Sequence, residues 1–115
     1  MTREVTIAAV QLPAVPEGET NAQIRTSNFE AAEFWLDKAG QGGTDIACLG
    51  ETFNKIGQQL TPENTPDAIS GAVEEAIDRL GTVARRHKMV VIAPVLGVVD
   101  GVVRNIALVL DRRGE

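Results

Sequence analysis

The stretch Asp45–Asn54, DIACLGETFN, guides the interpretation of the whole chain, because it is an apolar run that ends on a carboxylate. Residues 46–49 are all apolar and predict a buried strand at about residues 45–50. Gly50 then leads directly to Glu51. A carboxylate beside an apolar environment is costly unless it is paired, hydrogen-bonded or exposed. Glu51 is therefore either a rim residue without a role or a functional residue.

A strand and a helix are expected before this stretch. Residues 4–12 alternate and are partly β-branched, which predicts a strand that ends at Pro13. Thr20 and Gln23 form a capping-box pattern, which predicts a helix from there to about Ala39. Its mostly apolar face is expected to contain Ile24, Asn28, Ala31, Ala32, Trp35 and Ala39.

A polar loop, a second helix and two strands are expected after it. The helix is predicted at about residues 70–87, and the apolar run 89–99 predicts a strand in which Pro94 marks a bulge or an unpaired position. An Asp-Gly turn joins that strand to residues 102–110 as a hairpin. This order predicts an α/β sheet with helices stacked on it. The apolar stripe of the second helix is expected at Val73, Ile77, Leu80 and Ala84.

The composition excludes several classes of protein. The chain has 115 residues, which fits one domain, and 43% of them are hydrophobic. No apolar run reaches the roughly 18 residues that a membrane helix needs, and no secretory signal is recognisable, so we expect a cytoplasmic protein without a membrane partner. The net charge of −5 argues against binding nucleic acid. With one Cys and one His, neither an internal disulfide nor a zinc site is expected.

Glu51 and Cys48 are the first candidates for chemistry. Ligands of open α/β sheets bind outside the carboxyl ends of the strands, where Glu51 is placed, and a carboxylate there suits a general base. The alternative is a rim carboxylate held by a hydrogen bond. Cys48 and His87 invite a thiol–imidazole dyad, but a buried cysteine usually acts as a small hydrophobe and His87 complements a helix dipole. The glycines of residues 40–45 indicate a helix stop rather than a phosphate loop.

The end of the chain, DRRGE at residues 111–115, is turn-like and leaves two interpretations open. A turn normally leads to another element, so the sequence looks cut off. A frayed polar tail explains it equally well.

Taken together, VTIAAVQL, the helix ending in glycine, TDIACLGETF and NIALVLDRRGE resemble the opening of the carbon–nitrogen hydrolase (nitrilase) superfamily. The most specific pieces are Glu51 and the strand that begins at Asn105 and ends at Asp111 before an Arg-Gly turn. The resemblance covers essentially residues 1–115, but only the first part of a family member. It implies the N-terminal part of an α-β-β-α sandwich, with two helices on a mixed sheet of about four strands.

The resemblance also implies an activity. Family members hydrolyse nitriles or non-peptide amides with a Glu-Lys-Cys triad, without cofactor or metal, usually as homo-oligomers. The family glutamate matches Glu51. The family lysine and cysteine come later in the sequence than the end of this chain, so the chain alone is expected to be inactive. Three lysines and one cysteine stand in the wrong places for those roles: Lys38, Lys55, Lys88 and Cys48.

This sequence departs from the family pattern at two positions. In addition, two residues near Glu51 are predicted to contact substrate only because they are close to it in the sequence. Gly50 stands where the family commonly has proline, and in the hairpin only Asp100 is available as the frequent second carboxylate. Phe53 and Asn54 follow Glu51 directly and are predicted to line a pocket mouth for the substrate. A second hypothesis, motivated by the missing triad members, is a non-catalytic α/β module that binds a partner or self-associates.

Overall fold

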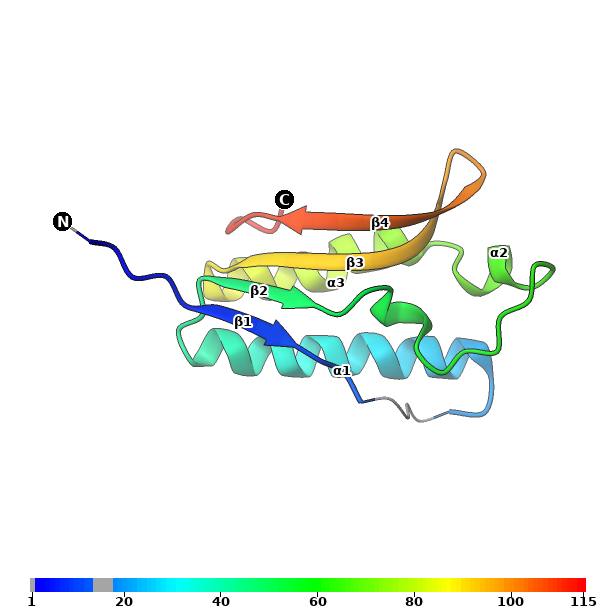
Figure 1. Cartoon of the computed structure of the whole chain (residues 1–115), viewed down its shortest axis with the longest axis horizontal. Coiled ribbons are helices and arrows are strands. Elements are labelled where there is room, and N and C mark those ends of the chain that lie inside the picture. Colours follow the sequence, from blue (N-terminus) through cyan, green and yellow to red (C-terminus); the bar gives the residue numbers. More distant parts are fainter. Residues whose placement is uncertain (1, 14–17) are drawn as a thin grey trace.

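The computed structural model describes residues 2–13 and 18–115, in which two long helices lie beside a four-stranded sheet (Figure 1). Each predicted strand and helix is present, and the polar loop also contains a 3-10 helix and a one-turn helix that the sequence did not predict. In chain order the elements are β1 (Ile7–Val10), α1 (Asn21–Gln41), β2 (Ile46–Leu49), the 3-10 helix η1 (Phe53–Lys55), α2 (Thr65–Ala68), α3 (Ala72–His87), β3 (Val90–Val99) and β4 (Val102–Leu110).

The sheet is mixed, with the strand order β1-β2-β3-β4. β1, β2 and β3 are parallel to one another, and β4 runs antiparallel to β3. The turn between β3 and β4 has positive φ at both Asp100 and Gly101, 52° and 74°, which is the backbone of the predicted two-residue hairpin. The register is continuous through Pro94, which lies opposite Ala107, so Pro94 makes no bulge.

Local sequence signals explain where the helices begin. Thr20 caps α1: its hydroxyl accepts from the Gln23 backbone N–H at 3.2 Å, and the Gln23 side chain accepts from the Thr20 N–H at 3.2 Å. This is the predicted capping box. Gly71 is the N-cap of α3 and has a φ of 72°, which suits glycine, and the acidic residues Glu74 and Glu75 occupy the first turn of the helix.

The helices bury faces that differ in part from the predicted ones. In α1 the expected Trp35 is wrong as a core residue, because 49% of it is exposed, whereas Phe29 and Leu36 are fully buried. In α3 the expected Ile77 is wrong, since it is 44% exposed. The buried face of α3 is rotated by one position and consists mainly of small residues, which allow the helix to approach the sheet closely: Ala72, Ala76, Leu80, Val83 and Ala84.

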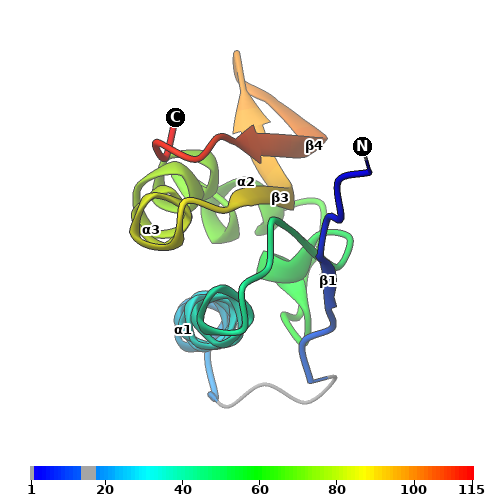
Figure 2. The same ribbon diagram turned by 90° about the vertical axis from the view of Figure 1, so that its left-hand side faces the viewer.

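Both long helices pack on one face of the sheet, and no described helix packs on the other (Figure 2). Because side chains alternate along a strand, the register identifies this second face, which we call the open face. It is apolar except for one asparagine, and two of its members, Ile7 and Val109, are 69% and 65% exposed. The open face consists of Ile7, Ala9, Ile46, Cys48, Val90, Ile92, Pro94, Leu96, Val98, Val103, Asn105, Ala107 and Val109.

Residues 111–115 turn back onto α3. The Asp111 side chain accepts from the backbone N–H groups of Arg113 and Glu115, at 2.8 and 3.1 Å. Gly114 has a φ of 83° and lies against the backbone of Gly81, where a Cβ on either residue would collide with the other. Glycine is therefore required at this contact for steric reasons as well as for its backbone conformation.

Candidate active site

Glu51 lies two residues beyond the end of β2. The parallel strands β1 and β2 have their carboxyl ends at the same edge of the sheet (Figure 1). Thr52, the next residue, is in the left-handed region with a φ of 47°, so the chain turns sharply here and leaves the sheet. The Glu51 side chain is exposed, and its Oε1 accepts a hydrogen bond of 2.8 Å from Nδ2 of Asn105 on β4. A carboxylate can follow a core strand here because it is both exposed and hydrogen-bonded.

The sheet register explains why two residues separated by 54 positions meet. Cys48 of β2 lies opposite Ile92 of β3, and Leu96, four residues further along β3, lies opposite Asn105 of β4. Glu51 follows Cys48 by three residues and thus lies at nearly the same height along the sheet as Leu96 and Asn105. Its carboxylate reaches Asn105 on the open face.

Asn54 fixes the loop that carries Glu51. Its side-chain Nδ2 donates to the Leu96 carbonyl at 2.8 Å, and its Oδ1 accepts from the Leu96 N–H at 3.0 Å. β2 has already ended at this height, so the amide group takes the place of a further β2 residue in the sheet. The Asn54 carbonyl accepts from Nδ2 of Asn28 on α1 at 3.2 Å, which ties the same loop to the helix layer.

Phe53 and Asn54, which the sequence placed at a pocket mouth, are both fully buried in this structure. The Phe53 ring packs edge-on against Phe29 of α1, with centroids 5.3 Å apart and an angle of 80° between the rings. The Asn54 amide is engaged with the backbone of β3. These contacts show both residues supporting the Glu51 loop, while the prediction that they contact substrate remains a prediction.

Cys48 and His87 lie on opposite sides of the sheet and do not form a dyad. Cys48 belongs to the open face, and its thiol is 3.4 Å from the Leu49 carbonyl. His87 ends α3 on the helix side, where its Nε2 is 2.6 Å from Oδ1 of Asp37. The interpretation of Cys48 as a strand residue and His87 as a helix-end residue fits this arrangement.

The lysines are also spread around the molecule. The Lys38 ammonium lies 5.6 Å from the centre of the Phe34 ring on α1, Lys55 is an exposed residue in η1, and Lys88 caps the C-terminus of α3 with a φ of 49°. No described residue other than Asn105 is hydrogen-bonded to the Glu51 side chain. Within residues 2–13 and 18–115, no group of three His, Cys, Asp or Glu residues has a metal-site arrangement.

Among the residues that the structure describes, two carboxyl groups with lowered pKa values, Asp37 and Asp111, have structural roles. Hydrogen bonds from His87 and then Arg86 lower the pKa of Asp37, which joins α1 to the end of α3. Backbone hydrogen bonds from Glu115 and Arg113 lower the pKa of Asp111, which organises the turn at residues 111–115. Neither group contacts Glu51.

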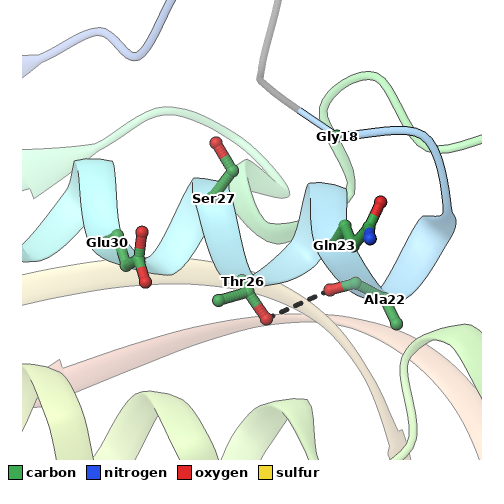
Figure 3. A pocket seen from close by; sticks show the side chains of 6 residues that line it. All are labelled: Gly18, Ala22, Gln23, Thr26, Ser27 and Glu30. Carbon is green, nitrogen blue, oxygen red and sulfur yellow. Dashed lines mark hydrogen bonds between the residues drawn. The ribbon is translucent and has the colours of Figure 1, made fainter.

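One surface depression is lined by residues other than Glu51. It has a volume of about 430 Å³ and lies along the first turns of α1 (Figure 3). The hydroxyl of Thr26 in its wall donates to the Ala22 carbonyl of the same helix at 3.1 Å, as is common for a helical threonine. Its described lining is Gly18, Ala22, Gln23, Thr26, Ser27 and Glu30. Glu51 is not among the residues that line this depression, and its side chain is exposed.

Sequence reasoning identified Asn105 as the start of a strand but not as the partner of Glu51. The signal that could have found it is the Asp100-Gly101 turn, because a two-residue hairpin pairs Val99 with Val102 and therefore Leu96 with Asn105. The sequence does not show the path of the chain between β2 and η1, which decides how close Glu51 comes to β4.

Comparison with known proteins identifies the relatives of this fold. The profile of the carbon–nitrogen hydrolase family matches residues 6–115. No curated protein matches the sequence. A carbon–nitrogen hydrolase from Helicobacter pylori G27 superimposes with a TM-score of 0.75 at 19% identity, covering 96% of this chain and 37% of that one. An amidase from Nesterenkonia sp. gives 0.69 at 20% identity, covering 96% and 40%.

A third similar structure is the NitFhit protein of C. elegans, with a TM-score of 0.72, 20% identity and coverage of 97% of this chain and 27% of that one. The chain therefore spans less than half the length of these structures. At this level of identity the superpositions show the fold, which is that of nitrilase-type enzymes: two helices on a mixed four-stranded sheet. None of the described helices is both long and apolar enough to cross a membrane. The family profile matches nearly the whole chain, and the chain belongs to the carbon–nitrogen hydrolase family.

Proposed function

We propose that this chain carries the general base, Glu51, of an enzyme that hydrolyses the carbon–nitrogen bond of a small amide or nitrile. The observation that supports this most directly is the geometry of Glu51: a hydrogen-bonded carboxylate at the carboxyl ends of parallel strands, in a chain of this family. Ligands of open α/β sheets usually bind at this edge, outside the carboxyl ends of the strands.

The proposed reaction uses a Glu-Lys-Cys triad, of which this chain supplies the glutamate. Glu51 accepts the proton of a cysteine thiol, and the thiolate attacks the carbon of the substrate and forms a covalent intermediate. A lysine ammonium stabilises the negative charge that develops. With an amide, the Glu51 carboxyl group then protonates the leaving amine, and the carboxylate activates a water molecule that hydrolyses the resulting thioester. With a nitrile, the addition gives a thioimidate, and one water molecule first replaces its nitrogen, which leaves as ammonia, before a second water molecule hydrolyses the thioester.

The lysine and the cysteine are proposed to come from a segment that follows Glu115 in a longer protein, with this chain as the N-terminal portion of one hydrolase domain. Coverage of only 27% to 40% of the three neighbours supports this division. The open face supports it as well, because a second sheet packed there would bury apolar side chains that the described helices leave uncovered. Solved forms of the Nesterenkonia amidase include a variant with acrylamide added at the active-site cysteine.

Ammonia release tests the proposal. The protein encoded by the complete reading frame is incubated with short aliphatic amides and nitriles, alongside its Glu51→Gln variant. We expect release by the parent and a loss of about 10²- to 10⁴-fold in the variant, since that is what a general base contributes. Glu74→Gln, on the first turn of α3, is the matched control and should keep the activity.

Two outcomes would contradict parts of the proposal. A parent protein that releases no ammonia from any of these compounds would refute the hydrolase assignment. Turnover by the 115-residue chain alone, or a reading frame that ends at Glu115, would refute its assignment as an N-terminal portion.

The open face favours one second candidate function, a module that self-associates. A continuous apolar sheet face is unusual on a monomer and would be buried if two copies packed face to face. Cys48 belongs to this face, so the rate at which its thiol reacts with a reagent in solution reports whether the open face is covered. Self-association predicts that Cys48 reacts more slowly with a thiol reagent as the protein concentration rises, together with a dimer in sedimentation. A monomer with constant Cys48 reactivity would exclude it.

A further inference from the structure

We infer that Asn105 is the positioning residue for the Glu51 carboxylate, a role that rests on the function proposed above. The direct evidence is the 2.8 Å hydrogen bond from Asn105 Nδ2 to Glu51 Oε1, which joins the loop after β2 to the middle of β4. Asn105 is also the one polar residue on a face of the described sheet that is otherwise apolar. The hydrogen-bond partner of this polar side chain is the Glu51 carboxylate.

Leu96 of β3 holds both partners in place. On one side, its backbone N–H and carbonyl are both hydrogen-bonded to the side chain of Asn54, three residues after Glu51. On the other side, Leu96 lies opposite Asn105 in the β3–β4 register. The loop that carries the carboxylate and the strand that carries its donor are therefore fixed to the same residue.

The type of the Leu96–Asn105 pair also brings the Asn105 side chain close to β3. Because both backbone hydrogen-bonding groups of Leu96 point toward Asn54, Leu96 and Asn105 exchange no backbone bonds with each other. In antiparallel sheets such pairs have the shorter Cα–Cα separation, with side chains closer together. Asn105 thus stands at the height of Glu51 on a rigid strand and needs only its short side chain to reach it.

An amide donor suits this task. It donates an N–H to one carboxylate oxygen and stops the carboxylate from rotating, but it adds no charge that would hold the proton-accepting group permanently as an ion pair. With Oε1 engaged by Asn105, Oε2 is the oxygen that remains to accept the thiol proton. Correct placement of a catalytic group contributes strongly to rate, and small displacements are costly.

The first test detects the hydrogen bond in the 115-residue chain by NMR, without any activity. The chemical shifts of the Asn105 side-chain amide protons should change with pH. They should follow the same titration curve as the chemical shift of the Glu51 carboxyl carbon. This shift should vanish in Glu51→Gln. The Asn21 side-chain amide donates to a backbone carbonyl, that of Gln59, and serves as the control resonance that should not follow Glu51. Absence of the coupled shift in Asn105 would overturn the inference.

The second test measures kinetics in the protein encoded by the complete reading frame. We expect Asn105→Ala to lower kcat by about 10- to 100-fold and to change KM by less than about 2-fold, because the placement of the base is lost and substrate contacts remain. Asn105→Asp keeps the shape of the side chain but loses the donor when ionised. Its kcat should therefore recover as the pH falls and the new carboxyl group becomes protonated, a dependence that a merely structural role would not produce.

The outcomes separate this inference from the function on which it rests. A coupled NMR shift with an unchanged kcat in Asn105→Ala would overturn the positioning role and leave the hydrolase assignment intact. A wild-type enzyme without activity refutes the proposed function, and the catalytic role of Asn105 with it. The variant Asn21→Asp, which alters an asparagine remote from Glu51, should keep the kcat and pH profile of the parent.

Discussion

Replacement of Asn54 by alanine is expected to destabilise the protein by about 2–4 kcal/mol. The side chain of Asn54 is fully buried and makes two hydrogen bonds to the backbone of Leu96, at 2.8 and 3.0 Å. The variant leaves the Leu96 N–H and carbonyl without these partners, and each such unsatisfied group costs about 1–3 kcal/mol. We take the lower part of the combined range because the two bonds are only partly buried.

The chain offers a matched control in Asn21. Its side chain makes the same pair of bonds to a single residue, donating to the Gln59 carbonyl at 3.0 Å and accepting from the Gln59 N–H at 2.8 Å. These bonds are exposed, so water can replace the amide, and Asn21→Ala is expected to cost less than about 1 kcal/mol. The two variants therefore make the same chemical change at a buried and an exposed site.

Urea unfolding followed by circular dichroism measures both variants against the parent. Native proteins typically have a free energy of unfolding of about 5–15 kcal/mol, so the expected loss for Asn54→Ala should lower the urea midpoint clearly with an unchanged m value. Equal effects of Asn54→Ala and Asn21→Ala would refute the argument that Asn54 replaces a strand residue in the sheet.

Two further predictions concern the contacts that hold the helices and the turn at residues 111–115. Gly114→Ala should cost more stability than Gly43→Ala, because both glycines have a φ of 83° but only Gly114 lies against another backbone. The left-handed conformation costs each variant about 1–2 kcal/mol, and any larger loss at Gly114 measures the contact with Gly81; equal losses would show that this contact relaxes freely. Hydrogen bonds from His87 and Arg86 hold the pKa of Asp37 below its ordinary value of 3.8. The stability that Asp37 contributes is therefore complete above that value and lost as the pH falls through its lower, folded-state pKa. Asp37→Asn should flatten the acid side of the stability profile between about pH 2 and 5, and a parallel profile for variant and parent would contradict this.

Local signals in the sequence predicted most of the fold because each acts over a few residues. The Thr20–Gln23 capping box sets the start of α1, and the Asp100-Gly101 turn sets the β3–β4 register. The helix faces were less predictable. Trp35 lies beside the edge strand β1, where no described element covers it. Its side chain is therefore half exposed, although its spacing along α1 matches that of the buried residues.

The candidate site was predictable in part. Glu51 was placed at the strand end because the apolar run stops there, whereas its donor Asn105 and the support of Asn54 come from pairings across 54 and 42 residues. Such pairings depend on the relative heights of β2, β3 and β4, which no local pattern encodes. Phe53 and Asn54 were singled out for their adjacency to Glu51, and in the structure they support its loop from inside.

Unequal strand lengths explain why a core strand of this protein ends on a charge. β2 has four residues and β3 has ten, so β3 continues beyond the last β2 partner, and its free backbone groups need new partners there. Asn54 supplies them at Leu96 with one side chain, which frees the main chain to leave the sheet after Glu51. A longer β2 would satisfy the same groups with backbone, but it would place a strand where the carboxylate now reaches Asn105. The early end of β2 thus creates the exposed edge that the proposed chemistry requires.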